Sequence, residues 1–346
     1  ELIGGRTAAM VGQSGVGNGV NDHATAVAAI LAGALPGREG VAPGAEIISI
    51  RIVGPDGTGD SFTLAKGIEE AIARGARVIN LSVGSHGDSP LVRIAVEHAL
   101  AEGIVVVASV GNDAVEGVTY PARYSGVVAV TAVDADRQHV YFANRGPQVG
   151  IAAPGLEVWA PSSTDTAFRF TGTSAATPFV AGSVAGILSI EPGLKPVEVA
   201  ALLLRYSNDA GLPGKDSEFG LGVLDLRRVL DRAVPGIHDI ALADNCLVTA
   251  PGKDAGRADL LVVVQNRGTE FLTGAELSVK INGEVKTAVL PATDPGETFA
   301  ARFEVAVRDA DRQAGIRVAS SVTIVGTRDD NPANNLRESL FMPPGL

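Results

Sequence analysis

Between about Thr25 and Leu230 the sequence alternates between short apolar runs and segments with helical periodicity, and this alternation limits the fold more than any other feature. The segment Ile104–Ser109 is almost wholly apolar, which is typical of a strand buried on both faces of a sheet. Glycines such as Gly75 and Gly103 follow the helical segments, where helices commonly end. The order strand, helix, strand, helix, strand predicts an α/β fold, a mostly parallel sheet with helices on both faces.

Individual elements follow from the same pattern. We expect strands at Ala45–Ile52, Val78–Val83 and Ile104–Ser109. We expect helices at Ser61–Arg74 (with Ser61 as a helix N-cap), Pro90–Glu102, Ser174–Ile190 and Pro196–Arg205.

The pattern changes after Val234-Pro235-Gly236, where only short alternating segments remain. The pair Asn282-Gly283 separates two of them and is the preferred two-residue hairpin turn, because both positions need positive φ. This predicts a small C-terminal antiparallel β-sandwich, with domains at 1–235 and 236–346. The expected strands are Asp259–Val264, Glu276–Ile281, Val285–Leu290, Thr298–Val305 and Ile316–Ile324.

Composition excludes two classes of partner. The chain has 28 Lys and Arg against 39 Asp and Glu, a net charge of -11, and no basic run of the kind that nucleic-acid binders carry. No apolar run reaches the roughly 18 residues that a membrane helix needs. We therefore expect no nucleic acid and no membrane span.

Ser174 lies in the string Gly172-Thr173-Ser174-Ala175-Ala176-Thr177-Pro178, directly before the longest apolar helix. Small residues would let a substrate backbone pass close to the serine oxygen. The helix N-terminus supplies N–H groups that favour a developing negative charge. A serine at this position can also be a plain N-cap.

Two further polar residues occupy similar positions. His23 follows Asp22 at the start of a helix of small residues, so its ring could project from the helix end into a cleft. Asn112 follows the buried strand ending at Ser109. In open α/β sheets ligands collect at the carboxyl ends of strands, and an asparagine there can donate its amide N–H to an oxyanion, although asparagine is also a common turn residue.

On these motifs the chain resembles the subtilisin-like serine proteases (subtilases), whose sequences H-G-T-H-V-A, A-x-G-N and G-T-S-M-A-T-P occur in this order. The resemblance covers roughly residues 1–232. Its other matches are Gly40-Val41-Ala42-Pro43-Gly44-Ala45, Val78-Ile79-Asn80-Leu81-Ser82-Val83-Gly84, Tyr120-Pro121-Ala122, Ala153-Pro154-Gly155 and Gly220-Leu221-Gly222-Val223-Leu224-Asp225.

The resemblance implies a secreted or periplasmic serine endopeptidase acting on protein or peptide substrates. It makes His23 the general base, Ser174 the nucleophile and Asn112 the oxyanion donor. It also implies that two segments hold the substrate as flanking strands, Ser82, Val83, Gly84 and Gly57, Thr58, Gly59. No cofactor and no metal in the site are implied, and structural calcium stays open. Gly12–Gly19 resembles a nucleotide-binding P-loop but lacks its Lys and following Ser or Thr.

The family's aspartate motif, D-[ST]-G, does not occur in the sequence. Either Gln13 stands in its place, or Glu1-Leu2 already follows it and the aspartate strand lies upstream of Glu1. We favour the upstream segment, because only 9 residues separate Gln13 from His23. The alternative function is a catalytically impaired protein of this fold that acts in binding or scaffolding.

The C-terminal segments resemble the bacterial adhesion-related immunoglobulin-like modules. Val264-Gln265-Asn266-Arg267-Gly268-Thr269 and Asn331-Pro332-Ala333-Asn334-Asn335-Leu336 carry this resemblance. It implies a spacer or binding unit without catalysis.

Overall fold

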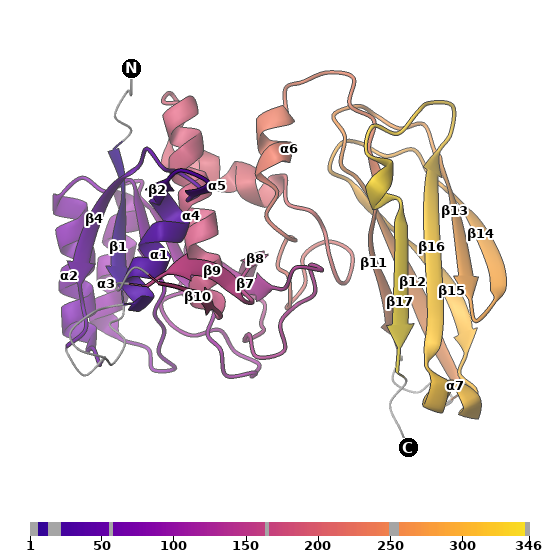
Figure 1. Ribbon diagram of the computed structural model, residues 1–346, viewed down its shortest axis with the longest axis horizontal. Coiled ribbons are helices and arrows are strands. Elements are labelled where there is room, and N and C mark those ends of the chain that lie inside the picture. The colour runs from indigo at the N-terminus through magenta and orange to yellow at the C-terminus, as the bar shows by residue number, and fades with distance from the viewer. Residues whose placement is uncertain (1–5, 13–21, 55–57, 163–165, 249–255, 343–346) are drawn as a thin grey trace. The chain divides into compact units, whose positions relative to one another are not determined.

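A computed structural model of the chain describes residues 6–12, 22–54, 58–162, 166–248 and 256–342 (Figure 1). The chain forms two compact units, Glu1–Arg205 with Ser217–Leu224, and Tyr206–Asp216 with Asp225–Leu346. Residues 206–216 and 225–235, which the sequence analysis assigns to the first domain, belong to the second unit. This division differs from the predicted boundary at 235/236, which stays a prediction.

The first unit is built on a six-stranded sheet in which all neighbouring strands are parallel. In spatial order the strands are β4 (Glu46–Arg51), β1 (Arg6–Gly12), β5 (Val78–Leu81), β6 (Val105–Ser109), β7 (Val128–Val133) and β8 (Val149–Pro154). The parallel α/β arrangement expected from the sequence is confirmed.

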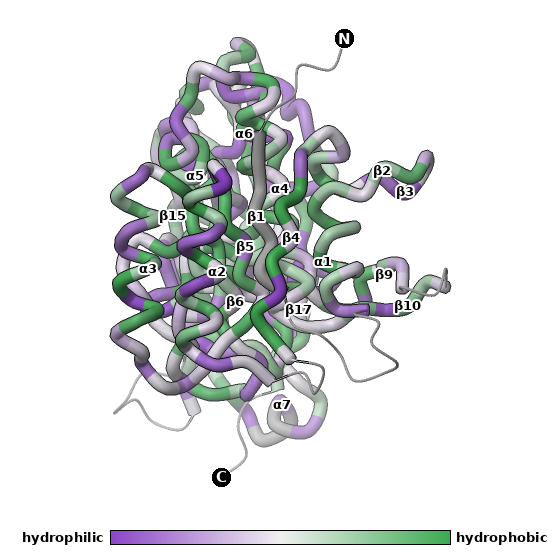
Figure 2. The backbone as a smooth tube through the Cα atoms, turned by 90° about the vertical axis from the view of Figure 1, so that its left-hand side faces the viewer, coloured by the Kyte–Doolittle hydropathy of each residue, from purple (hydrophilic) through white to green (hydrophobic). Residues whose placement is uncertain are grey.

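Helices cover both faces of this sheet (Figure 2). On one face, α2 (Ser61–Ala73) and α3 (Pro90–Ala101) pack on the apolar side chains of β4, β5 and β6. On the other face lie α1 (Asp22–Ala32) and α4 (Thr173–Ile190), and α5 (Pro196–Arg205) packs against α4. The expected N-cap at Ser61 is wrong, because Asp60 Oδ1 accepts the Thr63 N–H at 2.7 Å.

Helix α4 is a core helix. It is the one helix of the described residues that is long and apolar enough to cross a membrane, and 67% of it is buried within the protein. It packs closely on α1: a Cβ on Gly182 would lie 2.8 Å from Val41 Cβ and 3.1 Å from Leu31 O. The burial of α4 accounts for its composition.

Two short hairpins lie beside α1 and α4. The first joins β2 (Ala34–Leu35) to β3 (Arg38–Glu39), and the second pairs β9 (Val158–Pro161) with β10 (Ala167–Phe170). Phe170 and Ala160 of the second hairpin pack with Val27 and Ile30 of α1 and with Ala175 of α4. The hairpin therefore packs against both helices.

The second unit consists mainly of two antiparallel sheets that share one apolar core. One sheet has the order β11 (Ile240–Val248), β12 (Arg257–Asn266), β15 (Thr298–Ala306). The other has the order β14 (Glu284–Leu290), β13 (Ala275–Ile281), β16 (Ile316–Ile324), β17 (Leu336–Phe341). The short helices α6 (Leu226–Asp231) and α7 (Asp309–Ala314) and the 3₁₀ turn Pro332–Asn334 complete the unit. The turn between β13 and β14 is confirmed, with φ of 46° at Asn282 and 96° at Gly283.

A buried guanidinium ties α6 to the neighbouring loops of the second unit. Arg228 donates to the carbonyl oxygens of Tyr206 (3.2 Å), Ser207 (2.7 Å) and Arg267 (3.2 Å), and to Asn208 Oδ1 (3.4 Å). The residue is only 9% exposed, and burial lowers the pKa of Arg228. These bonds explain why residues 206–208 and α6 pack with the antiparallel sheets.

Candidate active site

Three of the predicted site residues, Ser82, Asn112 and Ser174, gather at one edge of the parallel sheet. Ser82 directly follows β5, Asn112 lies three residues beyond β6, and Ser174 is the second residue of α4. Because β5 and β6 are parallel, their carboxyl ends meet at the same edge, and α4 begins there.

Ser174 is joined to Ser82 by two hydrogen bonds. The Ser174 hydroxyl donates to the Ser82 carbonyl oxygen at 3.3 Å, and the Ser82 hydroxyl donates to the Ser174 carbonyl oxygen at 3.0 Å. Asn80 Nδ2 in turn donates to Ser82 Oγ at 3.1 Å. Asn80 is fully buried in an otherwise apolar strand, so this network fixes the first turn of α4 against the end of β5.

Asn112 caps α4 from outside the helix. Its Oδ1 accepts the Thr173 N–H at 2.9 Å, whereas the N-cap residue Gly172 has no side chain to do so. Because a backbone N–H can only donate, the bond fixes which end of the amide faces the helix and turns Nδ2 away from it. Among the described residues, neither Asn112 Nδ2 nor the Ser174 N–H has a hydrogen-bond partner, which leaves two donors beside the Ser174 hydroxyl.

Gly172 brings this arrangement about. Its φ is 142°, which an L-residue with a side chain rarely adopts, and a Cβ there would lie 3.3 Å from Asn112 Nδ2. A side chain at position 172 would therefore strain the backbone and crowd the amide.

His23 is the second residue of α1, and its ring meets the Phe170 ring edge-on, with the centroids 5.2 Å apart. Burial lowers the pKa of His23 to about 4, so the imidazole is neutral at neutral pH and can accept a proton. Its Nδ1 is fully buried and has no partner among the described residues. No hydrogen bond joins His23 to Ser174 in the described part of the chain, where the serine hydroxyl bonds to Ser82 instead.

Strand β1 ends close to these residues. It lies between β4 and β5, and Val11 pairs with Leu81, so the chain leaves β1 level with Ser82. This is the arrangement that the Gln13 alignment requires, but Gln13 itself lies outside the described residues. Since one strand fills this place in the sheet, an upstream aspartate strand could occupy it only by displacing Arg6–Gly12.

The two expected substrate-binding segments meet at a pocket of about 340 Å³. Gly59, Val83 and Gly84 line it, while Gly57 lies outside the described residues. The N–H groups of Val83 and Gly84 have no hydrogen-bond partner among the described residues, so this segment can pair with an extended peptide. The other lining residues were not predicted as site residues: Ile52, Val53, Asp60, Ser61, Leu64, Ser85, Gly87, Ser89, Val92, Tyr120 and Tyr124.

Sequence reasoning also missed Asn144. This fully buried side chain accepts the Asp113 N–H at 2.8 Å and the Val115 N–H at 3.4 Å, and so fixes the loop that carries Asn112. Asn144 stands in Ala143-Asn144-Arg145-Gly146, which looks like an ordinary turn, and nothing local distinguishes it.

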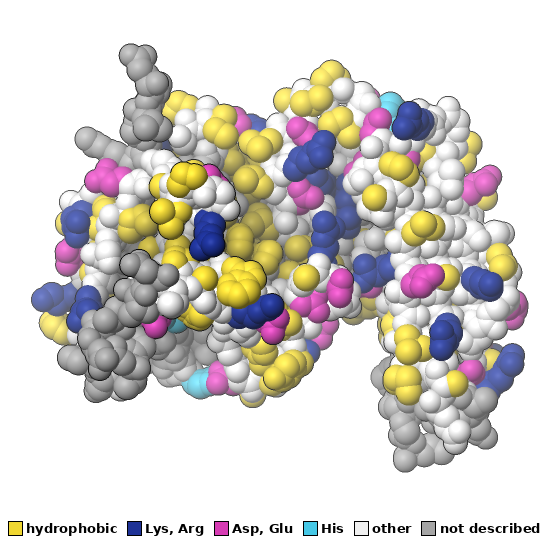
Figure 3. All heavy atoms as spheres, in the orientation of Figure 1, with side chains coloured by type: hydrophobic (Ala, Val, Ile, Leu, Met, Phe, Trp, Pro, Cys, Tyr) yellow, Lys and Arg dark blue, Asp and Glu magenta, His cyan; other side chains and the backbone are white. Residues whose placement is uncertain are grey.

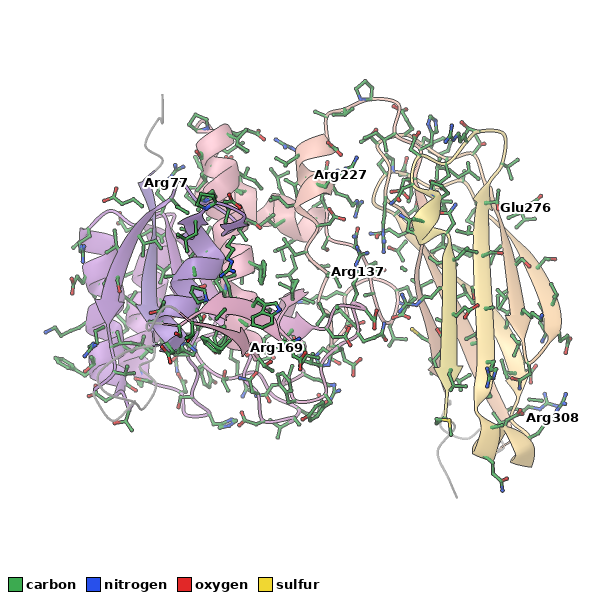
Figure 4. All side chains as sticks on the ribbon, viewed as in Figure 1. Arg77, Arg137, Arg169, Arg227, Glu276 and Arg308 are labelled. Carbon is green, nitrogen blue, oxygen red and sulfur yellow. The ribbon has the colours of Figure 1, made fainter. Side chains whose placement is uncertain are left out.

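A larger pocket of about 640 Å³ shares no residue with these segments. It lies between α1, the β2–β3 hairpin and β9, where hydrophobic side chains gather on the surface (Figure 3). Trp159 at its rim is 65% exposed and is covered by the Arg169 guanidinium, 5.0 Å from the ring centroid (Figure 4). Among the described residues no group of three or more His, Cys, Asp and Glu side chains could hold a metal ion.

Comparison with known proteins gives matches over this unit. The model of the Subtilase family (Peptidase_S8) matches residues 12–222. A thermostable alkaline protease from Halalkalibacterium halodurans is 37% identical over 214 residues, which are 61% of this chain and 57% of that protein. Subtilisin DY from Bacillus licheniformis is 34% identical over 232 residues, 65% of this chain and 83% of that protein.

Solved structures of two maturation proteases are also similar to this chain. The prenylagaramide maturation protease PagA has a TM-score of 0.60 at 25% identity and covers 65% of this chain and 93% of its own. The patellamide maturation protease PatA has a TM-score of 0.58 at 26% identity and covers 65% of this chain and 96% of its own.

Proposed function

Because the chain belongs to the subtilase family of serine peptidases, we propose that it is an endopeptidase that cleaves peptide bonds through an acyl-enzyme on Ser174. The observation that carries the proposal is the bond between Thr173 N–H and Asn112 Oδ1. It leaves the Asn112 amide and the Ser174 N–H free to donate to one oxygen beside the nucleophile.

In this mechanism Ser174 Oγ attacks the carbonyl carbon of the substrate while His23 Nε2 takes the hydroxyl proton. The carbonyl oxygen becomes an oxyanion and accepts bonds from Asn112 Nδ2 and the Ser174 N–H. His23 then gives its proton to the leaving amine, and water releases the acyl group by the same steps. To start, the hydroxyl rotates away from the Ser82 carbonyl, to which it donates in the free protein.

The buried Nδ1 of His23 needs an acceptor, and we propose that it lies outside the described residues. We favour an aspartate on a segment upstream of Glu1; the other source is Gln13. The acceptor sets the tautomer of the ring, and in serine proteases an amide in place of this carboxylate lowers kcat about 10⁴-fold. Without it the chain would be the impaired binding or scaffolding protein that is our alternative.

The substrate would lie between two chain segments, Ser82–Gly84 on one side and Gly57–Gly59 on the other. The unpaired N–H groups of Val83 and Gly84 support this for the first segment. We further propose that no cofactor takes part and that the protein works outside the cytoplasm, secreted or in the periplasm, as its named relatives include an extracellular protease of Bacillus subtilis.

For the second unit we propose an immunoglobulin-like β-sandwich that acts as a spacer or binding module. Its two antiparallel sheets with one common core support this, as do the Asn266 and Asn334 side chains, which bond to neighbouring loops.

The test of the proposed activity is covalent labelling of Ser174 by an alkyl fluorophosphonate, followed by mass spectrometry of the labelled peptide. We expect labelling at Ser174, none in Ser174→Ala, and unchanged labelling in Ser183→Ala, a buried serine further along α4. Failure of Ser174 to react, both with and without the upstream segment, would overturn the endopeptidase assignment in favour of the binding protein.

A further inference from the structure

Two glycines stand on opposite sides of the substrate path. Gly84 ends the segment that follows Ser82, and Gly111 precedes Asn112. Ser82 and Asn112 both form hydrogen bonds to the first turn of α4, so the nucleophile lies between the two segments. With no side chain on either glycine, the space between them would form an open slot beside Ser174.

The side chain of Thr119 fills this slot. A Cβ on Gly84 would lie 2.4 Å from Thr119 Oγ1. A Cβ on Gly111 would lie 2.8 Å from Thr119 Cγ2 and 2.4 Å from Asn144 Nδ2. Thr119 is 3% exposed. Both branches of one threonine therefore lie against the two glycine walls.

Thr119 is held firmly in this position. Its N–H donates to Val110 O at 3.0 Å and its hydroxyl donates to Ser109 O at 3.3 Å. The next residue, Tyr120, exchanges two backbone hydrogen bonds with Ser85, at 2.8 and 2.9 Å. The slot cannot be cleared by rotating the side chain without breaking the bond to Ser109.

The slot is where the side chain next to the scissile bond must go. In the proposed mechanism the attacked carbon lies at Ser174 Oγ and its oxygen points to Asn112 Nδ2. The Cα of the same residue is one bond away, with the backbone lying along Val83 and Gly84. Its side chain therefore points between Gly84 and Gly111, towards Thr119.

We infer that Thr119 is a specificity-determining residue, and that it limits the residue contributing the scissile carbonyl to a small side chain: Gly, Ala or Ser. This inference rests on the proposed function and deepens it by naming the substrate class. A larger side chain would have to displace buried atoms that are anchored to β6, which well-packed interiors resist.

The test compares two peptidyl diphenyl phosphonates that differ only in the side chain beside phosphorus, one alanine-like and one phenylalanine-like. We expect the alanine probe to label Ser174 at least about 100-fold faster in the natural protein, given the usual range for a filled pocket. Thr119→Gly should reduce this ratio about 10-fold or more by speeding the phenylalanine probe. Thr119→Ala removes the same two branches and serves if the glycine variant does not fold.

Two controls separate shape from other effects. Thr119→Val keeps the volume and loses only the hydroxyl bond, so its ratio should stay that of the natural protein. The alkyl fluorophosphonate, which carries no side chain for the slot, should label all variants within about 3-fold of one another, since they share the same nucleophile and oxyanion donors.

Equal labelling by the two phosphonates would overturn the inference, and so would an unchanged ratio in both Thr119→Gly and Thr119→Ala. In either case, labelling of Ser174 by the fluorophosphonate would still support the proposed function. If no probe labels Ser174, the proposed function fails, and calorimetry on Ser174→Ala with peptides ending in Ala or Phe still decides the slot. Tighter binding of the Ala peptide supports it, and equal binding removes it.

Discussion

Ser82 and Ser174 hold each other by reciprocal hydrogen bonds, each residue donating its hydroxyl to the other's carbonyl oxygen. Ser174, the proposed nucleophile, is thus positioned by the end of β5 as well as by its own helix. The buried amide of Asn80 supports this pair from within the strand.

Asn80→Leu tests whether this network positions the nucleophile or merely stabilises the fold. Leucine has a similar volume and suits a buried strand, so the free energy of unfolding should change by less than about 1.5 kcal/mol. The rate of Ser174 labelling should fall about 3- to 10-fold, because Ser82 loses the donor that orients its hydroxyl. Labelling kinetics and urea unfolding measure the two effects, and a variant that loses stability but labels at the normal rate would show a purely structural role.

A pair of substitutions at Asn112 separates its two bonds. Asn112→Asp keeps the oxygen that accepts the Thr173 N–H and removes the N–H donor, whereas Asn112→Ala removes both. Both should lower kcat about 10²- to 10³-fold at similar KM, the usual effect of losing an oxyanion donor. Only Asn112→Ala should lose about 1 kcal/mol of stability, as expected for a lost cap. Thermal unfolding together with peptide hydrolysis distinguishes the two, and normal turnover in Asn112→Asp would exclude the amide as a donor.

The pH dependence of labelling reports the environment of His23. Burial lowers the pKa of His23 to about 4, so labelling should fall with a midpoint near pH 4 as the ring takes up a proton. The unfolded chain takes up this proton near pH 6.5, so the stability contributed by neutral His23 is complete above pH 6.5. It is lost as pH falls to about 4, up to about 3 kcal/mol in total.

His23→Phe is the control for this titration, because it should remove that component of the stability profile. The prediction applies to residues 1–346 without the upstream segment. A labelling midpoint near pH 6 to 7 in this chain would contradict it and would indicate that a carboxylate of the chain itself faces Nδ1.

Adding an upstream segment to the chain tests where the acceptor for His23 Nδ1 lies. We expect a segment from upstream of Glu1 that carries the aspartate to raise the labelling rate by about 10³- to 10⁴-fold, since it restores the tautomer of the ring. Because one strand fills the place between β4 and β5, the segment should displace Arg6–Gly12. Hydrogen exchange should then show loss of protection at these residues. If instead Gln13→Asp raises the rate and the segment has no effect, Gln13 holds the position and β1 stays in the sheet.

Arg228 and Arg227 are neighbours with opposite surroundings, which provides a matched test in the second unit. Arg228→Leu removes the donor to four acceptors, so it should destabilise this unit by about 2 to 4 kcal/mol. Arg228→Lys should not restore the stability, because an ammonium group cannot reach all four acceptors. The Arg227 side chain is 89% exposed on α6 (Figure 4), and Arg227→Leu should change stability by less than about 0.5 kcal/mol. Unfolding followed by circular dichroism measures both, and equal effects would contradict a structural role for the buried guanidinium.

Much of the parallel sheet could be predicted because periodicity alone identifies it. Val78–Leu81 is apolar apart from Asn80 and Val105–Ser109 is apolar apart from its last residue, and α2, α3, α4 and α5 lie within a residue or two of the expected bounds. Strand β8 was missed because Gly150 and Pro154 interrupt its apolar pattern. Strand β7 was missed although Val128–Val133 has the apolar and β-branched composition of a buried strand. β11 was missed too, because Asp244-Asn245 interrupts its apolar pattern.

The site could be predicted only as far as its motifs reach. Their order brought Ser82, Asn112 and Ser174 to one edge of the sheet, but which atoms bond there depends on side-chain directions that spacing does not encode. The bond from Ser174 to Ser82 rather than to His23 is one example, and the Asn144 side chain beneath the Asn112 loop is another. The role proposed for Thr119 could not be predicted either, because it depends on contacts with Gly84 and Gly111, which lie 35 and 8 residues before it in the sequence.

The close approach of α4 to α1 at Gly182 links the position of Ser174, the proposed nucleophile, to a contact two turns further along the same helix. Ser174 and Gly182 lie on the same helix, on either side of Pro178, and a Cβ on Gly182 would meet Val41 Cβ and Leu31 O. A methyl group added at Gly182 would shift α4 relative to Val41 and α1. The Ser174 hydroxyl, two turns nearer the N-terminus of α4, would move with the helix. Tuning the reactivity of this protein therefore need not involve any residue that a substrate could touch.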